Sequence, residues 1–196
     1  MAGPDGRGAT LMLIIPTIRH GGTMFTLDLV GFPHGSMTGE LPSPERLFYI
    51  GNIEEKDMRE DDTIFGHVTA QTAPWFLPLI KENTTIVPLR HPYLVAKSWL
   101  DRGMYMPFLV DEWEAMVSEV DPLNPLYLPI DVPDRQDYLD NINSETGLGL
   151  TTEWEPQTEY QNHNLRHTDI EAPLPIIVAL VERIQPFLSR FYHEQH

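Results

Sequence analysis

The chain has 196 residues and a formal net charge of −16 at neutral pH. This length predicts one domain with a substantial buried core. The excess of acidic residues argues against a general nucleic-acid binder, because binding to a phosphate backbone needs clustered lysine and arginine. The sequence contains no cysteine, which excludes disulfides, thiolate catalysis and cysteine-ligated metals. No apolar run is long enough to span a bilayer, and residues 1–8 lack a signal-peptide core, so we expect a soluble, cytoplasmic protein.

Short apolar runs alternate with helix-like segments along the chain, which predicts an α/β fold with a mainly parallel central sheet in a three-layer sandwich. We expect strands at residues 10–15, 63–68, 84–89 and 126–130, and helices at 23–31, 72–82, 92–102, 111–120, 134–143 and 176–192. Residues 44–50 fit either a short helix or a strand. Residues 1–196 form one domain, in which 1–9 are expected to be a flexible tail and 144–173 an irregular polar segment.

A glycine-bearing turn follows the first predicted strand, in the run Arg19-His20-Gly21-Gly22-Thr23-Met24. A strand, a glycine turn and a helix start together form a common anion-binding device, because backbone N–H groups and the helix dipole both favour negative charge. Arg19 adds a positive charge at this turn. The alternative is an ordinary strand-to-helix turn whose glycines serve only backbone geometry.

Two further polar residues, His67 and Arg90, are expected near the carboxyl ends of the other predicted strands, where ligands bind in sheets of this kind. His67 ends the second strand, and its ordinary pKa of about 6.5 suits a general base. Arg90 ends the third strand, and Ser98 lies eight residues further on, inside the next predicted helix. An arginine fork and a serine hydroxyl suit a phosphate-like group. Taken singly, Arg90 could equally pair with a carboxylate, and His67 could be structural.

The order and spacing of these motifs resemble the sulfotransferase family, whose members use 3′-phosphoadenylyl sulfate (PAPS). The run 19–23 matches that family's loop around the 5′ phosphosulfate, Gly66-His67-Val68 matches its catalytic histidine segment, and residues 87–98 match its 3′-phosphate segment. The resemblance covers roughly residues 10–31 and 63–143. It implies a P-loop-like nucleotide-binding fold, with PAPS as co-substrate and no metal.

Under this resemblance the chain is a transferase that moves a sulfuryl group to a hydroxyl or amine of a small-molecule or glycan acceptor. Arg19 would stabilise the leaving phosphate and His67 would take the acceptor's proton. The PAPS-binding residues implied are Arg19, His20, Gly21, Gly22, Thr23, Met24, Arg90 and Ser98. Gly22 replaces a loop threonine of the family, and Met24 stands where the cytosolic branch has a tryptophan that stacks on adenine.

Two other functions stay open on sequence alone. A P-loop kinase of nucleotides or small molecules would share this layout, although the G-x-x-x-x-G-K-[ST] pattern is absent. A non-catalytic protein could keep the fold and use its acidic surface for a partner, and an oligomer is also possible. Loops 32–62 and 103–125 are expected to shape the acceptor pocket. A metal site at His163 and His167 is disfavoured because that segment reads as irregular.

Overall fold

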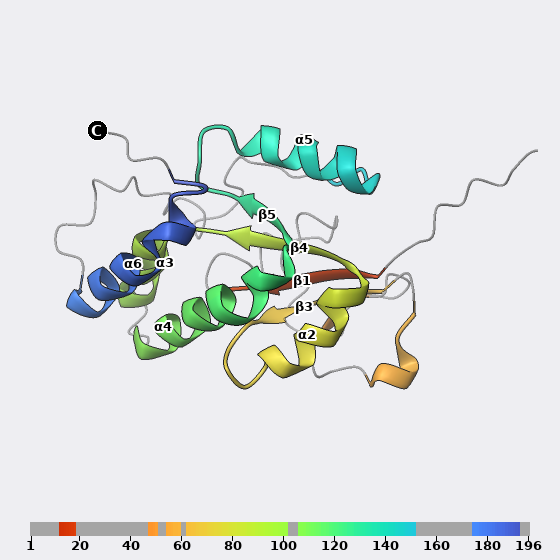
Figure 1. Ribbon diagram of the computed structural model, residues 1–196, viewed down its shortest axis with the longest axis horizontal. Helices are drawn as coiled ribbons and strands as arrows, with labels where there is room; N and C mark the ends of the chain where they lie inside the picture. The colour runs from red at the N-terminus through yellow and green to blue at the C-terminus, as the bar shows by residue number, and fades with distance from the viewer. Residues whose placement is uncertain are drawn as a thin grey trace, which may run out of the picture.

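The computed structural model describes residues 12–18, 47–50, 54–59, 62–101, 106–151 and 174–192. Within these ranges the chain forms a five-stranded sheet whose neighbouring strands all pair in parallel (Figure 1). The order across the sheet is β2-β3-β1-β4-β5. The strands are β1 (Leu13–Thr17), β2 (Leu47–Tyr49), β3 (Thr63–His67), β4 (Thr84–Leu89) and β5 (Leu126–Pro129).

Helices cover both faces of the sheet, as the sequence predicted. The α-helices are α2 (Ala73–Glu82), α3 (Pro92–Asp101), α4 (Met106–Ala115), α5 (Arg135–Thr146) and α6 (Pro175–Leu188). A short 3₁₀ turn, η2 (Glu55–Asp57), precedes β3, and α4 continues through a π-helical turn, η3 (Met116–Val120), into a 3₁₀ turn, η4 (Asp121–Leu123). None of the described helices is both long and apolar enough to cross a membrane.

The alternation of side chains along the strands divides the core between the two faces. In β1, Ile14 packs into the cluster that contains side chains of α2, α3, α4 and α6, whereas Leu13 and Ile15 pack with Leu139 and Ile142 of α5. Successive residues of a strand point to opposite faces, so β1, β3, β4 and β5 each supply both clusters. We call the first face the helix-rich face and the second the α5 face. The predicted three-layer α/β arrangement is confirmed.

Several predicted boundaries were wrong. The first strand was expected to stop at Ile15, where the apolar run ends before Pro16. It instead runs to Thr17, whose carbonyl accepts the N–H of Val68 at 3.0 Å. The undecided segment 44–50 contains strand β2. The helix expected at 111–120 begins at Met106, so much of the predicted loop 103–125 is helical.

Near the C-terminus two further boundaries differ. The segment expected to be irregular from residue 144 onward includes the last turn of α5, which ends at Thr146 with Gly147 in the left-handed conformation. The last helix ends at Leu188 rather than Tyr192, although its predicted apolar stripe is buried: Ile177, Leu180, Val181, Ile184, Leu188 and Phe191. Residues 189–192 therefore form a short segment that leaves the helix.

The strand order makes β1 the point at which the chain changes direction across the sheet. From β1 the chain passes to β2 on one side, whereas from β3 it crosses over β1 to β4 on the other side. In open parallel sheets, ligands bind beyond the carboxyl ends of the strands at such a switch point. The end of β1, with β3 and β4 on its two sides, is therefore where the fold favours a ligand.

Candidate functional site

The carboxyl ends of β1 and β3 lie level with each other. Thr17, the last residue of β1, is the register partner of His67, the last residue of β3. The hydroxyl of Thr17 donates to the backbone carbonyl of Gly66 at 3.0 Å, and its Oγ1 lies 3.3 Å from Nδ1 of His67. His67 is half-buried and Thr17 is fully buried. The predicted catalytic histidine therefore stands at the switch point of the sheet.

The Thr17 contact fits one tautomer of the His67 ring. A threonine hydroxyl has one proton, and in this arrangement it is donated to the carbonyl of Gly66. Oγ1 then faces Nδ1 as an acceptor, which fits the tautomer with its hydrogen on Nδ1. In the neutral imidazole this leaves the lone pair on Nε2. A general base needs such a lone pair, held in a fixed ring orientation.

Gly66 allows β3 to pack closely against the end of β2. A Cβ at this position would lie 2.5 Å from Cγ2 of Ile50, which is closer than side-chain carbons approach. The backbone N–H of Ile50 donates to the carbonyl of Phe65 at 2.7 Å, which fixes the same contact. A glycine before the histidine is therefore required here by packing between neighbouring strands, and it sets the position of His67.

The predicted phosphosulfate loop lies outside the described residues; it consists of Arg19, His20, Gly21, Gly22, Thr23 and Met24. The chain is described up to Ile18, one residue after β1 ends. The predicted helix at 23–31 and the two histidines at 163 and 167 also lie outside them. Within the part of the chain that the structure describes, no group of three or more histidine, aspartate or glutamate residues could hold a metal ion.

Arg90 follows β4 directly, on the other side of β1 from His67. Because neighbouring strands lie about 4.8 Å apart, the backbones at His67 and Arg90 are separated by roughly 10 Å across the end of β1. Arg90 is half-buried. Burial lowers the pKa of its guanidinium, while the negative charge of Asp131 opposes that shift. The structure thus brings His67 and Arg90 to one edge, on either side of β1.

Asp131 lies beyond β5 and links three segments of this edge. Its Oδ2 accepts the backbone N–H of His91 at 2.8 Å, and its Oδ1 accepts the hydroxyl of Tyr192 at 2.9 Å. Burial and the charge of Asp131 raise the pKa of Tyr192 well above its ordinary value, so the hydroxyl keeps its proton and remains a donor. We call Arg90, His91, Asp131 and Tyr192 the edge cluster.

His91 acts as the N-terminal cap of α3. Its Nδ1 accepts the backbone N–H of Tyr93 at 3.3 Å, and its carbonyl accepts those of Leu94 and Val95. The ring lies between the side chains of Tyr93 and Tyr192, with centroids 5.1 and 5.0 Å away. The backbone of Ser98 lies within α3, about 9 Å along the helix from Pro92. The Ser98 side chain lies outside what the structure describes.

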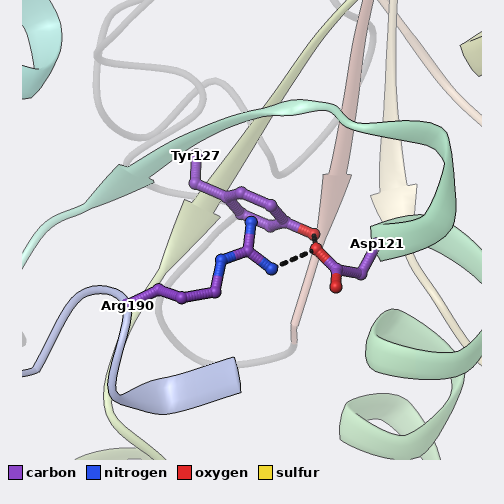
Figure 2. A network of polar contacts seen from close by, with 3 residues as sticks. All are labelled: Asp121, Tyr127 and Arg190. Carbon is purple, nitrogen blue, oxygen red and sulfur yellow. Dashed lines mark hydrogen bonds and ion pairs between the residues drawn. The ribbon is translucent and has the colours of Figure 1, made fainter. Parts of the chain in front are cut away.

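A second cluster of the same residue types lies on the helix-rich face (Figure 2). Oδ1 of Asp121 accepts the hydroxyl of Tyr127 at 2.8 Å and a guanidinium N–H of Arg190 at 2.7 Å. The guanidinium also lies 5.1–5.3 Å from the ring centres of Tyr127, Phe187 and Phe191. We call Asp121, Tyr127 and Arg190 the aromatic cluster. It anchors the end of α6 against η4 and β5.

Sequence reasoning missed three residues of the site. Thr17 was placed beyond the first strand, so its pairing with His67 was not anticipated. Asp131 was visible as an acidic residue directly after a predicted strand, and that position was the available signal. Tyr192 was assigned to the last helix, and only the tertiary structure brings it to the sheet edge.

Comparisons with known proteins do not assign the chain to a family. No family model matches this sequence, and no curated protein matches it either.

Proposed function

We propose that this protein binds 3′-phosphoadenylyl sulfate across the carboxyl edge around β1 and transfers its sulfuryl group to an acceptor hydroxyl or amine. One observation carries the proposal: His67 and Arg90 stand on opposite sides of β1, the strand that leads into the sequence Arg19-His20-Gly21-Gly22-Thr23. Binding of a nucleotide with two phosphate groups needs two separate anion contacts, and the transfer step needs a general base. These residues would supply both at one edge of the sheet.

The transfer is an in-line displacement at sulfur. The acceptor oxygen or nitrogen forms a bond to sulfur, and the bond between sulfur and the oxygen that bridges it to the 5′ phosphate breaks. Nε2 of His67 takes the acceptor's proton, and Thr17 holds the ring in the required tautomer. Arg19 and the amides of Gly21, Gly22 and Thr23 stabilise the charge that develops on the leaving phosphate.

Arg90 determines which nucleotide binds. Its planar guanidinium presents several donors that match phosphate oxygens. Under the proposal Arg90 binds the 3′ phosphate together with Ser98. It therefore favours PAPS over ATP, which has no 3′ phosphate. Because the chain carries a net charge of −16, a few arginines must provide a local positive field.

The decisive binding experiment compares adenosine 3′,5′-bisphosphate with ATP by thermal shift and calorimetry. We expect the bisphosphate to raise the melting temperature in a concentration-dependent manner, because it binds only the folded state. ATP should give no shift, with or without magnesium. Equal shifts by both nucleotides would favour a nucleotide kinase. No shift by either would remove the assignment to PAPS and favour a non-catalytic protein.

The role of His67 is tested with His67→Ala and Thr17→Val. Removing a general base lowers turnover by about 100-fold or more, whereas bisphosphate affinity should stay within about twofold because His67 is not a phosphate ligand in the proposal. Thr17→Val keeps the shape of the side chain but frees the ring to change tautomer, so it should reduce turnover by less than His67→Ala. Full sulfuryl transfer by His67→Ala would exclude His67 as the base.

A further inference from the structure

The turn between β3 and α2 is built around Thr69 and Thr72, which we call the threonine pair. The hydroxyl of Thr72 donates to the backbone carbonyl of His67 at 2.6 Å. Its Oγ1 accepts the backbone N–H of Thr69 at 2.9 Å and lies 3.2 Å from Oγ1 of Thr69. Oγ1 of Thr69 in turn accepts the backbone N–H groups of Gln71 and Thr72. The turn that follows His67 is therefore closed by side chains as well as by backbone.

One assignment of protons satisfies every bond in the threonine pair. A hydroxyl has one proton to donate and two lone pairs that accept. Because the proton of Thr72 goes to the carbonyl of His67, the contact between the two hydroxyls uses the proton of Thr69. Each hydroxyl then donates once and accepts twice. Both threonines are half-buried, so neither hydroxyl can rotate without losing hydrogen bonds that water only partly replaces.

Thr72 does not cap its own helix in the usual way. It stands at the N-cap position of α2, where a threonine is ordinarily extended and its oxygen accepts an N–H of the first helical turn. Here the backbone of Thr72 is in the helical region, with φ −93° and ψ −22°, and the side chain makes no cap hydrogen bond. The hydroxyl is turned back toward β3 instead. This orientation favours a role at His67 over a role in starting the helix.

His67 is held from two sides as a result. On the side of β1, Oγ1 of Thr17 lies 3.3 Å from Nδ1 of the ring, and the carbonyl of Thr17 accepts the N–H of Val68 at 3.0 Å. On the side of α2, the carbonyl of His67 accepts the hydroxyl of Thr72. Val68 is fully buried in the core of the helix-rich face. A shift of the backbone at His67 would therefore carry its ring away from Thr17.

We propose that Thr72 is a positioning residue for His67, and that Thr69 orients the hydroxyl of Thr72. The inference rests on the proposed function, since it names how the general base is held. Thr72 touches neither the nucleotide nor the acceptor under this proposal. It acts through the backbone of His67, which keeps the ring against Thr17 and holds Nε2 in one place at the edge of the sheet.

The first test observes His67 without any ligand. Ring ¹⁵N spectra report the tautomer of a histidine, and the signals of His67 are those that His67→Ala removes. Thr72→Val keeps the branched shape but loses the donor, so these signals should move toward the average of the two tautomers. Thr72→Ser keeps the hydroxyl and should leave them in place. In a Thr17→Val background, Thr72→Val should add little, because the contact with the ring is already lost. Unmoved signals in Thr72→Val, or equal movement in Thr72→Ser, would overturn the proposal.

Thr146→Val is the matched control for the loss of a hydroxyl. Thr146 is half-buried like Thr72 and donates to the backbone carbonyl of Ile142 at 2.8 Å, but it belongs to α5 on the other face of the sheet. Both valine variants should lower the melting temperature, because each removes a hydrogen bond to a backbone carbonyl. Only Thr72→Val should move the signals of His67. Equal movement in Thr146→Val would show a general effect of lost stability and overturn the proposal.

The second test measures transfer from PAPS to 4-nitrophenol as a probe acceptor. Thr72→Val should lower kcat about tenfold, because the base is displaced from its working position, while the dissociation constant for adenosine 3′,5′-bisphosphate stays within about twofold. Thr72→Ser should restore kcat to within about twofold of wild type. An unchanged kcat in Thr72→Val would overturn the proposal. If the wild type neither binds the bisphosphate nor transfers the sulfuryl group while the signals of His67 respond as expected, the proposed function is wrong and the positioning of His67 by Thr72 stands.

Discussion

The edge cluster and the aromatic cluster are built from the same residue types and use them differently. In each, an aspartate accepts a tyrosine hydroxyl and lies close to an arginine: Asp131 with Tyr192 and Arg90, and Asp121 with Tyr127 and Arg190. In the aromatic cluster the arginine donates directly to the carboxylate (Figure 2). Its guanidinium also lies over the rings of Tyr127, Phe187 and Phe191. In the edge cluster the second oxygen of the aspartate instead accepts a backbone N–H.

The difference shows how the same groups can serve stability in one place and binding in another. Arg190 donates a hydrogen bond and packs against aromatic rings at the end of α6, so it stabilises the folded state. Arg90 stands at the carboxyl end of β4, beside the switch point at β1, where the fold favours a ligand. We therefore expect substitutions in the edge cluster to change ligand affinity and those in the aromatic cluster to change the free energy of unfolding.

The largest expected contrast is in ligand affinity between two equivalent arginine substitutions. Arg90→Gln should weaken binding of adenosine 3′,5′-bisphosphate about 100-fold, because removing a partly buried arginine leaves the phosphate without its charged partner. Arg190→Gln should leave the affinity within about threefold, since that guanidinium is engaged on the helix-rich face. Titration calorimetry of both variants at one salt concentration measures the contrast. Equal losses in the two variants would mean that general charge, rather than position, attracts the nucleotide.

The next contrast is in stability. Asp121→Ala removes the acceptor of both the buried Tyr127 hydroxyl and Arg190. We expect a loss of about 2 kcal/mol in the free energy of unfolding, mainly because a buried donor loses its partner. The ion pair adds little, since the Arg190 side chain is 45% exposed.

Glu119→Ala is the matched control, because it removes an equal charge from an exposed position of the adjoining turn η3. It should change the unfolding free energy by less than about 0.5 kcal/mol. Urea unfolding of the two variants gives both values. A loss in Asp121→Ala no larger than that in Glu119→Ala would show that the aromatic cluster does not anchor α6.

The sequence was sufficient to predict the layers of the fold and the placement of two site residues. Strand β4 was predicted at its observed limits because Thr84–Leu89 is β-branched and apolar, as a strand buried on both faces requires. A parallel sheet brings the carboxyl ends of its strands to one edge, so His67 and Arg90 could be placed there from sequence. The roles of residues 19–24 and Ser98 stay predictions.

The parts that could not be predicted depend on contacts between distant segments. The apolar run ends at Ile15, yet β1 continues because Thr17 bonds to Gly66 and Val68, about fifty residues away. The pairing of Asp131 with Tyr192 spans a similar distance, and the early end of α6 that permits it has no strong local signal. Residues 106–110 were predicted to lie in a loop, although Pro107 falls in the first turn of α4, where a proline is tolerated.

The smallest contrast is in how the two clusters respond to alkaline pH. Burial raises the pKa of Tyr127 and of Tyr192 above the ordinary value of about 10, and the neighbouring aspartate adds to the shift in both. Above pH 10 the unfolded chain loses these tyrosine protons while the folded protein keeps them. The folded state then binds more protons, so stability present below pH 10 is lost as the pH rises. Each tyrosine contributes a slope of about −1.4 kcal/mol per pH unit in this window.

Tyr127→Phe and Tyr192→Phe should each remove one tyrosine's contribution to the pH dependence of the unfolding free energy. Urea unfolding at several pH values between 8 and 11 would measure it. Among the described residues, Tyr93 and Tyr138 add to the slope, because burial also raises their pKa values. The two substitutions should flatten the pH dependence alike, whereas only Tyr192→Phe should alter bisphosphate affinity at neutral pH. If Tyr127→Phe weakened the ligand as much as Tyr192→Phe, the division between a stabilising and a ligand-binding cluster would be wrong. Both tyrosines donate to an aspartate, but only Asp131 also accepts a hydrogen bond from the backbone that follows Arg90.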